Sequence, residues 1–127
     1  MNIGEITQII EGKVVCCEEN LKTEVCTCCA SDMMSDVLAF YSASNGVLIT
    51  GLVNPQIVRT AIMVDAVCII IARDKQVDDG IINLARDNGI VVVLSPYTMF
   101  ETCGRLYEAG LRKSKAYCLI VYTSFLM

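Results

Sequence analysis

The chain has 127 residues, enough for one domain with its own core and too few for two. Ten lysines and arginines against 14 aspartates and glutamates give a net charge of -4, and the basic residues are scattered, so nucleic acid is not expected as a partner. The apolar fraction of 54% is high, which predicts strands covered on both faces and association into a homodimer.

The two ends of the chain bear on its location. The N-terminus lacks the basic region and the long apolar stretch of a secretory leader, so we expect a cytoplasmic protein with reduced cysteines. Residues 116–127 (AYCLIVYTSFLM) are strongly apolar, but 12 residues are fewer than the roughly 20 that span a bilayer as a helix, and no membrane partner is expected. They belong to an apolar C-terminal extension, 112–127, which either adds an edge strand or contacts a neighbouring subunit.

The first half of the chain alternates helix and strand. A helix with an isoleucine face is expected up to Gly12, and a short strand follows at 13–17. Residues 24–40 (EVCTCCASDMMSDVLAF) predict an apolar strand, a polar turn and an amphipathic helix with Asp32 as its N-cap. A strand at 47–50 and a helix at 55–64, with Pro55 at its first position, come next.

The second half continues the alternation. Residues 66–72 (AVCIIIA) are apolar throughout, as expected of the central strand of a parallel sheet. A helix ending at Gly89 and a buried strand at 90–94 follow. Thr98 and Glu101 then form a capping-box pattern, which opens a helix expected to turn Phe100, Cys103, Leu106 and Tyr107 inward. The whole pattern predicts an α/β protein, a three-layer α/β/α arrangement with a largely parallel sheet.

Several catalytic systems are excluded by missing residues. The chain has no histidine, which rules out Ser-His and Cys-His nucleophiles and histidine-containing metal sites. It also lacks the P-loop pattern and a GxGxxG motif after a strand. We therefore expect no catalytic residues and no enzymatic activity; an enzyme would require a carboxylate or thiol with a strongly shifted pKa in a cleft.

The turns after the predicted strands are the best candidates for ligand binding. In a parallel sheet the carboxyl ends of the strands meet at one rim, and the helix N-termini there offer N–H donors to anions. The candidates for a small anionic or nucleotide-like ligand at this rim are Ser31, Asp32, Gly51, Asn54, Ser95 and Thr98. Arg59 and Arg73 are candidates for the counter-charge.

The eight cysteines allow a second hypothesis. Strand alternation would place Cys26 and Cys28 on one face, where Cys16 or Cys17 could supply a third thiolate for an iron-sulfur cluster. The spacings typical of zinc ribbons and ferredoxins are absent, however, so buried free thiols are the favoured interpretation.

The sequence also resembles a known family. Four separated motifs, within residues 1–111, resemble the DRTGG domain family in the right order: EVCTCCASDMMSDVLA, VLITGLVNPQIVRTA, AVCIIIA and FETCGRLYEAGL. The family occurs as small stand-alone proteins and as a spacer in CBS-bearing pyrophosphatases and some phosphate acetyltransferases. Thr27 and Cys28 stand where the family has its signature glycine pair, and Thr23 where it has a basic residue, which weakens the case for a ligand close to that turn.

The resemblance implies a non-catalytic α/β domain that regulates or scaffolds and associates through its sheet edge or its helices. Small family members are often encoded with iron-sulfur hydrogenase and electron-transfer components. This association implies, as the alternative function, a redox accessory protein that has a partner in a redox or regulatory complex.

Overall fold

The computed structural model describes residues 1–41 and 45–112, which fold around a five-stranded sheet with the order β1-β5-β4-β3-β2. Strands β2 to β5 are parallel and β1 pairs antiparallel with β5. The predicted central strand is β4, and the largely parallel sheet is confirmed. The strands are β1 (Lys13–Cys16), β2 (Thr27–Ala30), β3 (Gly46–Thr50), β4 (Ala66–Ile71) and β5 (Val91–Leu94).

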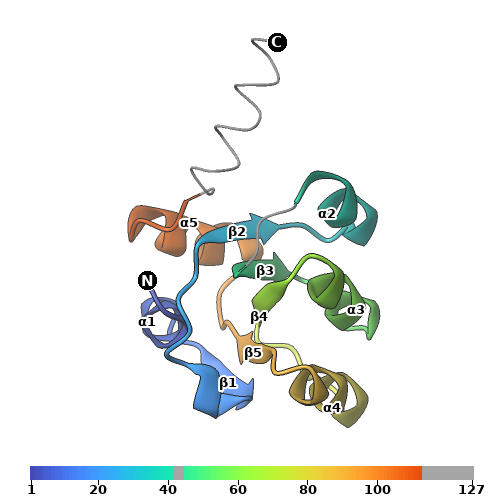
Figure 1. Ribbon diagram of the computed structural model, residues 1–127. Coiled ribbons are helices and arrows are strands. Elements are labelled where there is room, and N and C mark those ends of the chain that lie inside the picture. The colour runs from blue at the N-terminus through green and yellow to red at the C-terminus, as the bar shows by residue number, and fades with distance from the viewer. Residues whose placement is uncertain (42–44, 113–127) are drawn as a thin grey trace.

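Helices cover both faces of the sheet, which confirms the three-layer prediction. On one face lie α2 (Met34–Phe40), α3 (Gln56–Met63) and α4 (Asp79–Asp87), and on the other lie α1 (Ile3–Ile9) and α5 (Met99–Glu108) (Figure 1). A single 3-10 turn, η1 (Glu18–Asn20), follows β1. Among the helices of the described ranges, none combines the length and apolar character needed to cross a bilayer.

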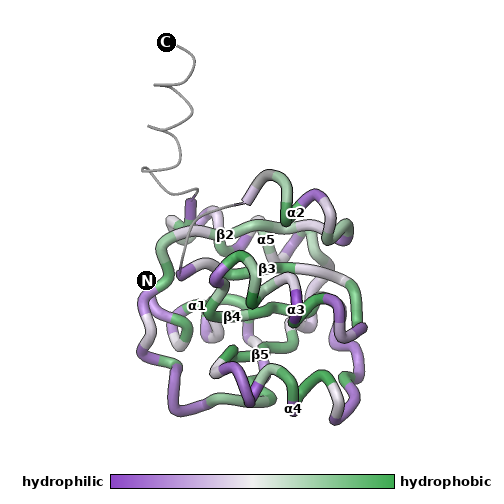
Figure 2. The backbone as a smooth tube through the Cα atoms, turned by 45° about the vertical axis from the view of Figure 1, so that its right-hand side comes forward, coloured by the Kyte–Doolittle hydropathy of each residue, from purple (hydrophilic) through white to green (hydrophobic). Residues whose placement is uncertain are grey.

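The core lies along the three middle strands. Every residue of β3 and β5 is buried, and β4 is buried apart from Val67. Figure 2 colours these strands largely green, toward the hydrophobic end of its scale. Continuous Val and Ile runs favour this position, because a strand with helices on both faces has no side exposed to water.

The helix starts follow the predicted caps only in part. Thr98 accepts the Glu101 N–H at 3.3 Å, as the capping-box pattern predicts. The prediction that Asp32 caps the following helix is wrong: α2 begins after Met33 without a side-chain cap. The reason is that Asp32 Oδ1 accepts the Gly51 N–H at 2.6 Å, since the parallel neighbour β3 ends beside it.

Helix α5 departs from the prediction on its apolar side. Leu106 is buried and Cys103 is half-buried, but Phe100 is 88% and Tyr107 62% exposed, so the prediction that all four face inward is wrong. In Figure 1 α5 lies beside the edge strand β2, and Phe100, Cys103 and Tyr107 line a depression there together with Cys28 and Ala30 of β2. The predicted extension 112–127 lies, beyond Arg112, outside the described residues.

Candidate functional site

The carboxyl ends of the parallel strands surround a cavity of about 350 Å³, here called the rim cavity. Each of the strands β2 to β5 is followed by a residue that lines it, which is the convergence expected of an open α/β sheet. Asp32 follows β2, Gly51 follows β3, Arg73 and Lys75 follow β4, and Thr98 and Phe100 follow β5. Ala72 and Met99 complete the lining.

Asp32 and Gly51 join the ends of β2 and β3. Besides the Gly51 N–H, Asp32 Oδ1 accepts the hydroxyl of buried Thr50 at 3.0 Å. A Cβ on Gly51 would lie 3.3 Å from that carboxylate and 3.5 Å from Lys75 Nζ. Glycine therefore lets a carboxylate and an ammonium group approach one backbone position closely.

The cationic side of the rim cavity comes from the loop after β4. Arg73 and Asp74 adopt left-handed backbone conformations with φ of 68° and 48°, which cost non-glycine residues about 1–3 kcal/mol each. Two hydrogen bonds hold the loop: Arg73 N–H donates to Tyr97 O at 2.8 Å and Asp74 N–H to Ser95 O at 2.7 Å. Lys75 Nζ donates to Gly51 O. The loop thus places two cations on the cavity wall.

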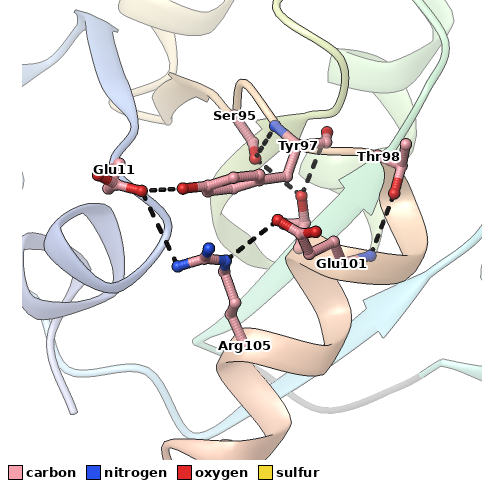
Figure 3. A network of polar contacts seen from close by, with 7 residues as sticks. Glu11, Ser95, Tyr97, Thr98, Glu101 and Arg105 are labelled. Atoms are coloured by element: carbon pink, nitrogen blue, oxygen red, sulfur yellow. Dashed lines mark hydrogen bonds and ion pairs between the residues drawn. The ribbon is translucent and has the colours of Figure 1, made fainter.

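Internal hydrogen bonds hold the turn from β5 into α5 (Figure 3). Ser95 is buried, and its Oγ lies 2.7 Å from Thr102 Oγ1 while accepting the Tyr97 N–H at 3.2 Å. Together with the Thr98 cap, these bonds fix the first turn of α5. The turn therefore presents Thr98 and Phe100 to the rim cavity from a rigid support.

An outer network connects the same turn to Glu11, in the turn between α1 and β1 (Figure 3). The Tyr97 hydroxyl donates to Glu11, and the Arg105 guanidinium lies 3.9 Å from the centroid of the Tyr97 ring. Arg105 also pairs with Glu101 at 3.3 Å and with Glu11 at 3.9 Å. Since these groups are partly exposed, the network orients the turn more than it stabilises the fold.

Comparison with known proteins identifies the family. The model of the DRTGG domain matches residues 5–109. The chain belongs to the DRTGG domain family. A similar solved structure contains the CBS and DRTGG domains of the regulatory region of Clostridium perfringens pyrophosphatase, complexed with the activator diadenosine tetraphosphate. It has a TM-score of 0.68 and 19% identity, over 83% of this chain and 45% of that chain. No curated protein matches the chain.

The match confirms the resemblance and the fold. The identity to the solved structure is low, so the likeness carries the fold alone, and this chain spans less than half of that regulatory region.

The six predicted ligand-binding residues divide into two groups. Asp32, Gly51 and Thr98 line the rim cavity, whereas the other three have local structural roles. Ser31 Oγ accepts the Met33 N–H at 3.0 Å, Asn54 Oδ1 accepts the Gln56 N–H at 3.0 Å, and Ser95 holds the β5–α5 turn. Whether any of the six binds a ligand stays a prediction.

Charge and aromatic character add residues to this site. Arg73, one of the two predicted counter-charges, lines the rim cavity, while Arg59 is an exposed residue of α3 outside its lining. Lys75 and Phe100 were missed by sequence reasoning. Lys75 lies only four positions beyond β4, a signal that was available, but the inward prediction for Phe100 hid its place at the cavity wall.

The cysteines do not form the predicted thiolate set. Cys16 lies on β1 and Cys28 on β2, at opposite edges of the sheet, so four strand spacings of about 4.8 Å, roughly 19 Å, separate them. The metal set of Cys16, Cys26 and Cys28 is therefore wrong. In the described ranges no three cysteines or carboxylates are grouped as metal ligands. Burial, with Cys103 and Cys29 nearby, raises the pKa of Cys28 to about 11, which keeps its thiol protonated at neutral pH.

Proposed function

We propose that this DRTGG domain is a non-catalytic regulatory domain that binds a small nucleotide-like anion in the rim cavity. The observation that carries the proposal is the convergence of Arg73, Lys75 and the N-terminus of α5 on one cavity, beside the exposed ring of Phe100. The cavity volume of about 350 Å³ lies at the small end of ligand pockets, which suits a mononucleotide.

The phosphate of such a ligand would lie between the two cations and the first turn of α5. Arginine and lysine supply positive charge, and a helix N-terminus adds N–H donors and the positive end of its dipole. Asp32 lies across the cavity with its Oδ1 engaged by Thr50 and Gly51. Its other oxygen is a negatively charged acceptor, which suits a ribose hydroxyl better than a phosphate. The phosphate of the ligand would therefore face the two cations and its ribose would face Asp32.

The base of the ligand would stack on Phe100. An aromatic ring that is 88% exposed gains from covering its face, and base stacking is worth about 1–3 kcal/mol. The solved neighbour supports a nucleotide over other anions, because that regulatory region is complexed with a nucleotide activator. A ligand bound by residues that follow four different strands would contact all four strand ends at once. Ligand binding would thereby stabilise one arrangement of the rim, and a partner protein could respond to that arrangement.

A thermal-shift screen tests the proposal. AMP, ADP, ATP and inorganic phosphate are added separately to the full chain, since a ligand that binds only the native state raises its melting temperature. We expect adenine nucleotides to raise it more than inorganic phosphate. No shift with any of them would overturn ligand binding and leave scaffolding as the function.

Two variants locate the ligand. Lys75→Gln removes one charge but keeps a donor for Gly51 O, and we expect it to weaken nucleotide binding about tenfold, or 1.4 kcal/mol. Lys22→Gln, at an exposed lysine outside the cavity lining, is the matched control. Phe100→Leu should weaken the binding of adenine nucleotides and leave the binding of inorganic phosphate unchanged. Equal losses in Lys75→Gln and Lys22→Gln would place the ligand elsewhere.

We also propose that the domain forms a homodimer. Exposed apolar side chains lie on the adjacent helices α2 and α3, with Leu38 40% and Met63 70% exposed, and apolar surface of this kind is usual where subunits meet. Light scattering of the wild type and of Met63→Glu tests this contact. A monomeric mass for the wild type would overturn it.

A further inference from the structure

A second depression lies on the other side of Phe100 and has a different character. This apolar groove has a volume of about 350 Å³ and runs between α5 and the edge of the sheet. Cys28 and Ala30 of β2, Ile49 of β3, and Phe100, Cys103 and Tyr107 of α5 line it. None of these side chains is charged, so the groove offers no counter-charge to an anion.

The groove marks an incomplete helical layer. One face of the sheet carries α2, α3 and α4, whereas within residues 1–41 and 45–112 the other face carries only α1 and α5 (Figure 1). The uncovered place lies over β2, beside α5. This explains why the apolar side of α5 is exposed: its sequence has the pattern of a covered helix, but the described residues supply only part of the cover.

The chain continues from the mouth of this groove. Leu111 lines the groove and is buried, and Gly110, with φ of 111°, turns the chain out of α5. The Arg112 guanidinium lies 3.5 Å from the centroid of the Tyr107 ring and donates to Tyr107 O, which holds Arg112 beside the end of α5. The next residues in the sequence therefore start beside the uncovered surface.

Those residues have the composition that the groove requires. Lys113, Ser114 and Lys115 form a short polar link with a reach of about 10 Å. Residues 116–127 follow, and ten of these 12 are apolar and none is charged. A segment of this length and composition can bury Tyr107 and the side of Phe100 that faces the groove, and each large apolar side chain fully removed from water contributes about 1.5–3 kcal/mol.

We propose that residues 116–127 pack into the apolar groove of their own chain and complete the helical layer over β2. The three-residue link favours the same chain over a second copy, because it holds the segment at a high effective concentration next to the groove. The proposal gives the apolar extension an intramolecular role that does not rest on ligand binding in the rim cavity, although the two regions share Phe100.

Thiol accessibility in the full chain tests the proposal. Cys28 and Cys103 line the groove, whereas exposed Cys26 does not, so pulse alkylation with mass-spectrometric detection has an internal reference. Leu119→Asp with Val121→Asp makes the segment polar, and Lys113→Asp adds the same kind of charge to the link as a matched control. We expect the alkylation of Cys28 and Cys103 to accelerate about tenfold in the double variant and to stay unchanged in the control. A tenfold change corresponds to a packed segment that is about 1.4 kcal/mol more stable than the segment detached from the groove.

Two results would overturn it. Equal alkylation rates in the wild type and the double variant, with Cys26 unchanged in both, would show that residues 116–127 do not cover the groove. The second result concerns a neighbouring copy. When isotope-labelled double variant is refolded together with unlabelled wild type, Cys28 of the labelled chains should stay reactive. Its protection in the mixture would assign the groove to a segment from another chain.

Discussion

The rim cavity and the apolar groove have the same volume, about 350 Å³, and share Phe100, yet their chemistry is opposite. The rim cavity lies where the parallel strands end, so the Asp32 carboxylate, the Thr98 cap and two cations gather there. The apolar groove lies along the side of α5 and the edge strand, where alternating apolar residues face outward. We therefore propose different occupants for two depressions of equal size, an anion in the rim cavity and apolar chain in the groove.

The difference has a structural origin. The rim is polar because any parallel sheet leaves strand ends and helix starts at one edge. The groove is apolar because a helical layer is incomplete among the described residues. The first is a property of the fold, and the second depends on how much chain this protein places beside α5. Variants on either side of Phe100 can test whether the two regions behave independently.

The largest effect is expected at the floor of the apolar groove. Leu106 is buried and lines it, and Leu106→Ala should lower the free energy of unfolding by about 2–5 kcal/mol, because it removes buried methyl groups and enlarges the groove. Urea denaturation measures the loss. Glu108→Ala, on exposed surface of the same helix, should change stability by about 0.5 kcal/mol or less. A proportional loss of nucleotide affinity in Leu106→Ala would contradict the independence of the two regions.

A smaller loss is expected behind the rim cavity. Ser95→Ala removes the shorter of the two hydrogen bonds of the buried Thr102 hydroxyl and the acceptor of the Tyr97 N–H, which should cost about 1–3 kcal/mol of stability. Ser31→Ala is the control, since Ser31 is only partly buried and bonds within its own turn. Thermal unfolding of both variants measures the difference. Equal losses would mean that Ser95 does not hold the turn.

Arg73 should show opposite effects on stability and binding. Arg73→Gly relieves a left-handed conformation, for which we expect a gain of about 1 kcal/mol over Arg73→Ala. Both variants remove the same charge from the rim cavity, so both should bind nucleotides more weakly than the wild type. Denaturation and thermal-shift measurements on the pair separate strain from charge. Unchanged nucleotide binding in both variants would exclude Arg73 from the site.

Most of the fold could be predicted because hydrophobic periodicity and turn residues agree along the chain. The apolar runs of β3, β4 and β5 predicted buried parallel strands, and Gly89 at the end of α4 has the left-handed φ of 67° that its place after a helix suggests. The location of the rim could be predicted as well, because the predicted strands also define where the strands end.

The errors share a cause: they depend on which distant segment lies next to a residue. Asp32 has the composition of a cap, but the end of β3 brings Gly51 within reach first. Alternation could not show that β1 and β2 occupy opposite edges, which separates Cys16 from Cys28. The periodicity of α5 predicted a covered side, yet the sequence alone does not say which segment would cover Phe100.

The smallest effect concerns the protonation of the groove thiol. Burial raises the pKa of Cys28 from the usual 9.0 to about 11, so the folded state keeps a proton that the unfolded state releases. This contribution to stability is complete below pH 9 and is lost as the pH rises through the interval up to about 11. Denaturation between pH 8 and pH 11 should show a smaller slope in Cys28→Ala.

The remaining slope in Cys28→Ala should come in part from Cys17, because burial and the neighbouring Cys16 raise its pKa to about 11 as well. An unchanged slope in Cys28→Ala would mean that the Cys28 thiol is solvated. The same titration also tests whether residues 116–127 occupy the groove, as we propose. If residues 116–127 exclude further water from Cys28, its pKa rises further, and making that segment polar with Leu119→Asp and Val121→Asp should shift the transition to lower pH.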